Sequence, residues 1–235
     1  MRPVAIFRFA PGDEPGHFAD WLAAAGRPRR LFALHDGEPV PSSAAPYAGI
    51  GMMGGPMSVN DPLPWVAPME SLVRDAIARG VPVIGHCLGG QLLATALGAR
   101  VRRAATAEIG WTGVEPCDAA AAGEWFGGRS RFAMFQWHYE TFDLPEGARR
   151  VLANPFTANQ AFVVGDRHLG MQGHVEITAA IARSWVALSG AELPRASTPS
   201  MQSAADLLAD LDARVAASNA VADDVYARWA RRLVH

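Results

Sequence analysis

Short runs of apolar and β-branched residues alternate with longer amphipathic segments along the first half of the chain. Strand-like runs occupy residues 4–9, 31–34, 49–53 and 81–84, and apolar residues at helical spacing mark 15–25, 65–79 and 91–97. Gly26, Gly80 and Gly98 follow the three helical segments, as is typical of helix ends. This order of elements predicts an α/β fold, with a central, mostly parallel open sheet and helices on both faces.

The second half of the chain differs in its pattern, because short strand-like runs dominate it. Turn residues separate short strand-like runs at residues 100–103, 109–114, 132–137, 150–153, 161–164 and 169–172. We expect these to form additional edge strands, some of them antiparallel. A helix is predicted at 177–188, and 204–233 has the apolar spacing of one or two amphipathic helices. We therefore predict one main domain at residues 1–190 and a C-terminal helical extension at 191–235 that packs on that domain.

Composition narrows the class of protein. The chain has 235 residues, half of them hydrophobic, and its 21 basic and 23 acidic side chains give a net charge of −2. Such a balance favours neither nucleic acid nor an anionic membrane as a partner. The sequence contains no apolar run of membrane-spanning length, and its N-terminus leads directly into a predicted strand, so neither a membrane segment nor a signal peptide is expected. The two cysteines are too few for a disulfide framework, and we expect a reducing, cytoplasmic location.

A cysteine stands at the junction between a predicted strand and a predicted helix. Gly85-His86-Cys87-Leu88-Gly89-Gly90-Gln91 follows the apolar run at 81–84. Strand, sharp turn and helix with a thiol at the turn form the layout of a nucleophile elbow. A helix N-terminus favours thiolate over thiol, and thiolate is the nucleophile. The alternative is a buried structural cysteine, which is the usual role of a lone one.

A thiol nucleophile needs a base, and the base needs an orienting partner. His174 and Glu176 lie two residues apart, so in an extended segment their side chains project to the same side. Taken alone, such a pair is more often a solvent-facing one. His86 points away from Cys87 if both continue the strand, and it fits a structural role better. His138 is expected to line a pocket, or to compete as the base.

Acyl transfer also requires hydrogen-bond donors aimed at the developing oxyanion. The N–H group of Leu88 follows the nucleophile at the predicted helix start. The segment Gly54-Gly55-Pro56 follows a strand of the same predicted sheet, so its backbone can reach the same edge as Cys87. By itself such a segment is usually an ordinary turn. No CxxC or HExxH motif occurs, and we expect neither a metal nor a cofactor.

The order and spacing of these motifs resemble those of class I, triad-type glutamine amidotransferases. The resemblance covers about residues 4–185 and is strongest to stand-alone members similar to the amidotransferase domain of GMP synthase. It is carried by the elbow around Cys87, by Gly54-Gly55-Pro56, by Glu108-Ile109-Gly110-Trp111, by residues 137–145 and by Gln172-Gly173-His174-Val175-Glu176. The resemblance implies a flavodoxin-like fold.

The same resemblance assigns roles to individual residues. Cys87 would attack the side-chain amide of glutamine and form a γ-glutamyl thioester with release of ammonia. His174 would transfer the proton, and Glu176 would orient His174. The remaining assignments concern substrate binding. The N–H groups of Gly55 and Leu88 would hold the oxyanion, and Gln91 would help to position the glutamine. The backbone of residues 137–139, including Tyr139, would contact the amino-acid end of the glutamine.

Two departures from the family pattern keep other activities open. Val175 replaces the usual proline, and Gly173 replaces a usual aromatic residue. A γ-glutamyl peptide hydrolase with the same triad is one alternative, and a non-catalytic regulatory or binding protein is another. The sequence contains no GxxxxGK[ST] phosphate loop. Any acceptor of the ammonia would therefore be a synthetase on a separate partner protein, or the enzyme acts alone, and a homo-oligomer contact is also open.

Overall fold

The computed structural model describes residues 1–234 and contains a nine-stranded mixed sheet, with the order β2-β1-β3-β4-β9-β8-β7-β5-β6. Its first five strands run parallel. They are β1 (Val4–Arg8), β2 (Arg29–Ala33), β3 (Gly49–Met52), β4 (Val83–His86) and β9 (His168–Met171). Because their carboxyl ends meet at one sheet edge, the loops after β1, β3, β4 and β9 are brought together there. The predicted α/β fold with a parallel core is confirmed.

The additional strands extend the sheet beyond β9 by antiparallel pairing. They are β8 (Ala161–Val164), β7 (Arg149–Ala153), β5 (Val101–Pro116) and β6 (Phe132–Phe142). The sequence pattern predicted separate strands at 100–103 and 109–114, whereas the structure has the single strand β5. Its pairing with β6 shifts register between Arg103 and Glu108, and the alanine-rich interval between them interrupts the pattern of the two strand-like runs.

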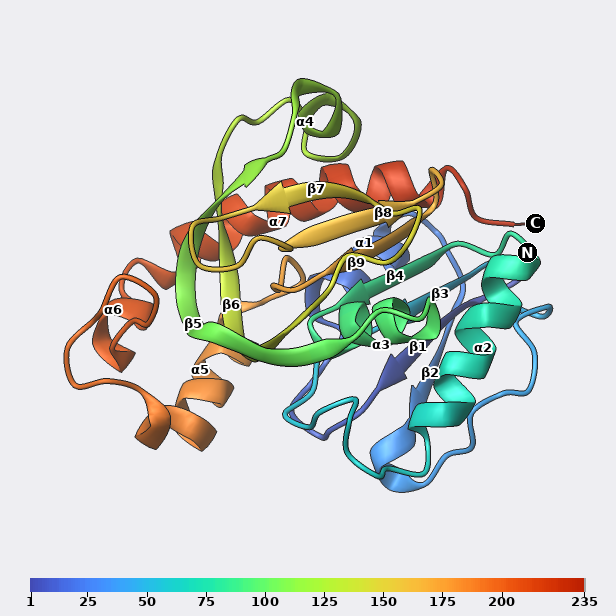
Figure 1. Ribbon diagram of the computed structural model, residues 1–235, viewed down its shortest axis with the longest axis horizontal. Helices are drawn as coiled ribbons and strands as arrows, with labels where there is room; N and C mark the ends of the chain where they lie inside the picture. Colours follow the sequence, from blue (N-terminus) through green and yellow to red (C-terminus); the bar gives the residue numbers. More distant parts are fainter. Residues whose placement is uncertain (235) are drawn as a thin grey trace.

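Helices cover both faces of the sheet (Figure 1), and the alternation of side chains along each strand builds one core on each face. In β1, Ile6 packs toward α1 (Gly16–Ala24) and α7 (Leu211–Ala230). Its neighbour Phe7 packs on the opposite face, toward α2 (Val66–Ala78) and α3 (Leu88–Ala96). Strands buried on both faces explain why these runs are almost wholly apolar in the sequence.

Smaller helical elements lie around the antiparallel half of the sheet and its edges. They are η1 (Leu34–Asp36), α4 (Ala119–Trp125), α5 (Ala179–Ser189), η2 (Gly190–Glu192) and α6 (Ala204–Leu208). A third apolar cluster joins α5 and α6 to β5 through Ile181, Leu207 and Ile109. In Figure 1, α5 and α6 project beside the ends of β5 and β6.

The C-terminal helix α7 packs on the parallel sheet. Its Tyr226 and Trp229 are fully buried, and the Trp229 ring leaves no space for a side chain at Gly49 of β3. Burial of two large aromatic side chains is worth roughly 1.5–3 kcal/mol for each. The domain boundary at 190/191 stays a prediction, and His235, the last residue of the predicted extension, lies outside the described residues. Within residues 1–234, no helix is both long and apolar enough to cross a membrane.

Candidate active site

Cys87 occupies a strained turn between β4 and α3. Its backbone has φ +50° and ψ −108°, a conformation that non-glycine residues rarely adopt. The Cys87 N–H donates to the carbonyl oxygen of Met171 at 2.9 Å, which ties the turn to β9. A Cβ atom added at Gly85 would lie 2.2 Å from the Gly89 carbonyl oxygen, so the turn requires glycine there. Strain held by such packing is typical of a functional nucleophile.

Helix α3 begins at Leu88, directly after the thiol, and not near residue 91 as the sequence pattern predicted. The pattern placed the start too late because the pair Gly89-Gly90 lowers helix propensity. In the structure both glycines allow close packing: an added Cβ would lie 2.4 Å from the Met52 carbonyl oxygen at Gly89, and 2.3 Å from that of Met171 at Gly90. The helix N-terminus therefore lies immediately beside Cys87.

His174 and Glu176 come from the segment that follows β9. The His174 backbone N–H donates to the Phe135 carbonyl oxygen at 2.8 Å, and Nδ1 of its ring lies 2.6 Å from Glu176 Oε1. The Glu176 backbone is held in turn, because its carbonyl oxygen accepts the His17 N–H at 2.9 Å. With Nδ1 paired, Nε2 of His174 remains for proton transfer.

The His174 imidazole and the Cys87 side chain both lie close to Gly54, a glycine of the loop that follows β3. An added Cβ at Gly54 would lie 2.7 Å from His174 Cε1 and 3.7 Å from Cys87 Cβ. Cys87 and His174 also line one cavity. The three side chains predicted to form a triad are thus brought together from the ends of β4 and β9.

Charge distribution within this cluster favours an ion pair. Burial alone would lower the pKa of His174, but the negative charges of Glu176 and Cys87 raise it to about 10. Burial alone would raise the pKa of Glu176, but the charge of His174 and its hydrogen bond to the carboxylate hold that pKa below its ordinary value. The raised pKa keeps the imidazole protonated at neutral pH, so that His174 forms an ion pair with the Glu176 carboxylate and holds a proton beside the cavity.

A second layer of buried polar groups lies behind the carboxylate. His86 Nε2 is 3.8 Å from Glu176 Oε2, and burial holds the pKa of His86 below its ordinary value. The His86 Nδ1–H donates to the Met52 carbonyl oxygen at 3.3 Å. That tautomer leaves Nε2 to accept the hydroxyl of Tyr226, at 3.2 Å. Through Tyr226 and His86, helix α7 is thereby linked to the Glu176 carboxylate of the triad.

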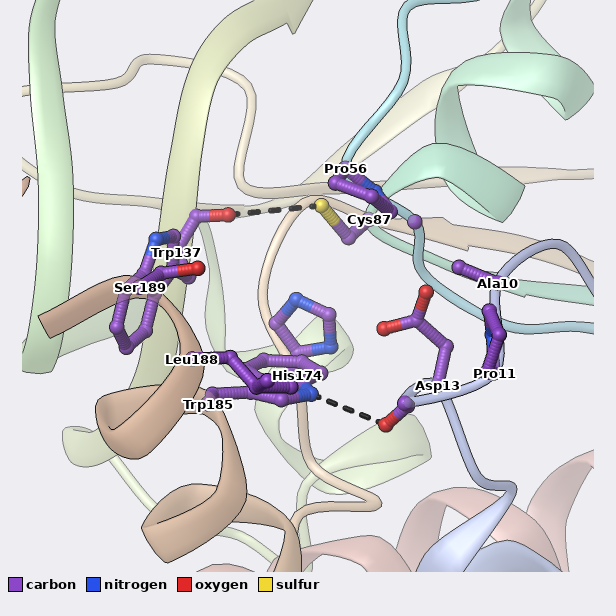
Figure 2. A pocket seen from close by; sticks show the side chains of 12 residues that line it. Ala10, Pro11, Asp13, Pro56, Cys87, Trp137, His174, Trp185, Leu188 and Ser189 are labelled. Carbon is purple, nitrogen blue, oxygen red and sulfur yellow. Dashed lines mark hydrogen bonds between the residues drawn. The ribbon is translucent and has the colours of Figure 1, made fainter.

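The cavity beside Cys87 has a volume of about 400 Å³ and is mostly apolar (Figure 2). Such a volume lies within the range of roughly 300–1,000 Å³ that small-molecule sites occupy. Gly55 and Pro56 line one side of it, next to the nucleophile, where the Gly55 and Leu88 N–H groups are the candidates for an oxyanion hole. Although Cys87 is only 6% exposed, this cavity gives a substrate access to its sulfur.

Comparisons with known sequences and structures identify the family of this chain. The sequence model of the family described as glutamine amidotransferase class-I matches residues 34–184, more than half of the chain. The chain belongs to the class I glutamine amidotransferases. Its structure is similar to that of a glutamine amidotransferase from Methylobacillus flagellatus, with TM-score 0.96 and 43% identity over 100% of this chain and 96% of that one. A glutamine amidotransferase from Thermotoga maritima has TM-score 0.85 and 26% identity, over 97% of this chain and 98% of that one.

Relatives identified by sequence are of two kinds. The GMP synthase of Aeropyrum pernix is 33% identical over 161 residues, which are 66% of this chain but only 29% of that protein. The chain therefore spans less than a third of that relative. A glutamine amidotransferase-like protein of Salmonella typhimurium, YfeJ, is 26% identical over 189 residues, 77% of this chain and 78% of that one.

Gly55 lines the cavity of this amidotransferase, whereas the three other predicted substrate-binding residues, Leu88, Gln91 and Tyr139, do not. Gln91 is buried, with its Nε2 3.4 Å from Gln172 Oε1, and Gln172 Nε2 is 3.7 Å from Cys87 Sγ. The Tyr139 hydroxyl donates to Glu192 Oε2 of η2 at 2.7 Å, away from the thiol. The roles assigned to these residues remain predictions. By contrast, the Trp137 carbonyl oxygen is 3.9 Å from Cys87 Sγ and Trp137 lines the cavity.

Other residues occupy places that differ from their expected ones. His138 was expected at the pocket, but its ring is buried with Nε2 3.4 Å from Glu108 Oε2, and it does not line the cavity. At Gly173, an added Cβ would meet Gln136 and Met134 at 2.7 Å, so β6 already fills the space of the aromatic side chain that the family usually has there.

Sequence reasoning missed four residues that shape the site. Asp13, Trp185 and Leu188 line the cavity, and Tyr226 lies behind the triad. The Trp185 ring packs against His174 with a centroid separation of 4.8 Å. The sequence offered only the position of Asp13 after the first predicted strand, since the carboxyl ends of parallel strands commonly carry sites.

Proposed function

We propose that this amidotransferase hydrolyses the side-chain amide of glutamine through a γ-glutamyl thioester on Cys87. The observation that carries the proposal is that the thiol and His174 line one cavity, with His174 Nδ1 2.6 Å from Glu176 Oε1. Family membership supports the same chemistry, because it makes glutamine the expected source of nitrogen.

In this proposal the Cys87 sulfur attacks the γ-carbonyl carbon of the substrate. The oxygen becomes an oxyanion held by the N–H groups of Gly55 and Leu88, each worth about 10²–10³ in rate. His174 gives its Nε2 proton to the amide nitrogen, the C–N bond breaks, and ammonia leaves. A water molecule then gives a proton to His174 and attacks the thioester, which releases glutamate and restores the thiolate–imidazolium pair.

The acceptor of the ammonia is proposed to reside on a separate synthetase. Because the chain spans 29% of the Aeropyrum GMP synthase, most of that relative has no counterpart here. We infer that this enzyme either delivers ammonia to a partner protein or acts as a glutaminase by itself. Cytoplasmic location and a homo-oligomer contact remain predictions.

Labelling of the thiols tests the proposal. A diazo-ketone analogue of glutamine should alkylate Cys87 in the folded protein and abolish ammonia release from glutamine. Cys117 is an internal control, because it is an exposed free thiol far along the chain from the triad. Labelling at Cys117 alone, or glutamine turnover that survives Cys87→Ala, would contradict the proposal and favour a non-catalytic protein.

A second candidate activity is hydrolysis of γ-glutamyl compounds with larger γ-substituents. The observation that favours it is the extent of the cavity beyond the thiol, to Pro11, Trp185 and Leu188. The carboxamide of glutamine alone has no group that would occupy this apolar part. Turnover of γ-glutamyl amides relative to glutamine compares the two candidates directly.

A further inference from the structure

One buried carboxylate in the cavity has no role in the triad. Asp13 lies on the loop between β1 and α1, is 8% exposed, and lines the cavity that contains Cys87. Within the described part of the chain, its Oδ2 atom is buried without a hydrogen-bond partner. Buried charged groups are normally paired, so an unpaired one that faces a cavity points to a ligand of opposite charge.

The loop does not need this carboxylate for its own structure. Backbone groups hold it: the Asp13 N–H donates to the Ala10 carbonyl oxygen at 3.2 Å, and the Asp13 carbonyl oxygen accepts from Arg8 Nε at 3.3 Å. From the other side of the cavity, Trp185 Nε1 donates to the Gly12 carbonyl oxygen at 3.1 Å. The side chain of Asp13 is thus directed into the cavity by a loop that is fixed through its backbone.

The carboxylate carries a charge at neutral pH despite its burial. Burial raises the pKa of Asp13 to about 6, although the positive charge of His174 acts to lower it. A cation in the cavity would compensate this burial. The charge of His174 acts on Asp13 without a hydrogen bond to Oδ2, which has no hydrogen-bond partner among the described residues. The cationic side chain of Arg8 is directed to the backbone of the loop and to Glu14.

The position of Asp13 indicates which part of a substrate it faces. Figure 2 shows its carboxylate pointing into the cavity from the side opposite Trp137. The Trp137 carbonyl oxygen lies by the sulfur, on the side where the amino-acid end of a γ-glutamyl group is expected. With the amino-acid end on the Trp137 side, the departing γ-nitrogen and its substituent would lie on the Asp13 side, where Pro11, Trp185 and Leu188 form apolar walls.

We propose that this enzyme, besides glutamine, accepts γ-glutamyl alkylamines whose γ-substituent ends in an ammonium group, and that Asp13 binds this ammonium. The inference rests on the proposed thioester chemistry. The apolar walls would hold the alkyl chain, and the carboxylate would pair with its charged end. In the reaction, the amide C–N bond breaks, His174 protonates the nitrogen of the departing diamine, and water later releases glutamate from Cys87. The bound ammonium itself is unchanged.

The test compares a charged substrate with a neutral one of equal shape. Hydrolysis of γ-glutamyl-1,4-diaminobutane and of γ-glutamyl-n-pentylamide is measured in the wild type and in Asp13→Asn, which keeps the size of the side chain. We expect kcat/KM of the wild type to favour the ammonium substrate by tenfold or more, and this ratio to fall close to one in Asp13→Asn. Glutamine is measured alongside, since all three substrates carry the same α-ammonium group.

Each other outcome overturns the assignment in a recognisable way. An equal loss in Asp13→Asn for all three substrates would place the α-ammonium, and not the γ-substituent, at Asp13. A charge preference that persists in Asp13→Asn, or is absent from the wild type, would refute the inference.

A binding measurement separates this inference from the proposed chemistry. Calorimetric titration of the Cys87→Ala protein with the two intact substrates needs no turnover. Tighter binding of the ammonium compound that disappears in Cys87→Ala/Asp13→Asn supports the role of Asp13 even if thioester formation were refuted. Equal binding of the two compounds would refute the role of Asp13 while leaving the thioester proposal in place.

Discussion

Gly54→Ala gives the sharpest test of the triad geometry. An added Cβ would lie 2.7 Å from His174 Cε1, whereas ordinary contacts begin near 3.4 Å. The ring must therefore retreat by about 0.7 Å, the difference between the two distances. Since the ring is held by Glu176 on its other nitrogen, the movement misaligns Nε2 with the sulfur. A misplacement of ~1 Å can cost ~10²-fold in rate, so we expect kcat to fall by about 10–10²-fold.

The assay is ammonia release from glutamine at saturation, with thermal unfolding of the same samples. Gly54 has an ordinary backbone conformation, so the substitution introduces a clash and no backbone strain. A matched control is Gly123→Ala in α4, where an added Cβ has nothing within 4 Å. It should keep full activity and gain roughly 0.5–1 kcal/mol of stability. Wild-type turnover by folded Gly54→Ala would refute the close approach of the His174 ring to the loop after β3.

Three further predictions concern the buried polar groups of the site. The pKa of His174 is raised from 6.5 to about 10, so the pairing of its imidazolium stabilises the fold fully below pH 6.5, and this stabilisation is lost as the pH rises through 10. Denaturant titrations should therefore show that the difference in unfolding free energy between wild type and His174→Gln shrinks over that pH range. Burial raises the pKa of Asp13 from 3.8 to about 6, so the ionised carboxylate destabilises the folded protein. The free energy of unfolding at pH 7 should therefore be higher for Asp13→Asn than for wild type, by up to about 3 kcal/mol. This difference should vanish as the pH falls from 6 to 3.8. Tyr226→Phe removes the hydroxyl that lies 3.2 Å from His86 Nε2. We expect it to lower the free energy of unfolding by about 1–3 kcal/mol and to lower kcat several-fold. An unchanged melting temperature and an unchanged kcat would show that α7 does not support the triad.

Local signals in the sequence were strong where the structure depends on neighbours along the chain. Apolar runs and helical spacing located the parallel strands and the covering helices. The strand–turn–helix order around Cys87 predicted the elbow. The spacing of His174 and Glu176 allowed, and the family resemblance implied, a contact that the structure shows at 2.6 Å. Weaker local patterns gave wrong element bounds. The alanine-rich interval between Arg103 and Glu108 hid the continuity of β5, and Gly89-Gly90 hid the start of α3.

The sequence by itself determined the class of fold, the nucleophile elbow and the pairing of histidine with carboxylate, because each follows from the chain's own periodicity or from residues close together. Only the tertiary structure decided which distant groups share the site: Asp13 from the loop after β1, Trp185 from α5 and Tyr226 from α7. These residues come together because the segments that follow β1 and β9, and the helix α7, pack at the same edge of the sheet. Whether a side chain there is paired depends on the neighbours that this packing supplies. No local pattern encodes that, since a lone aspartate or tyrosine looks the same in a sequence whether it faces water or a nucleophile.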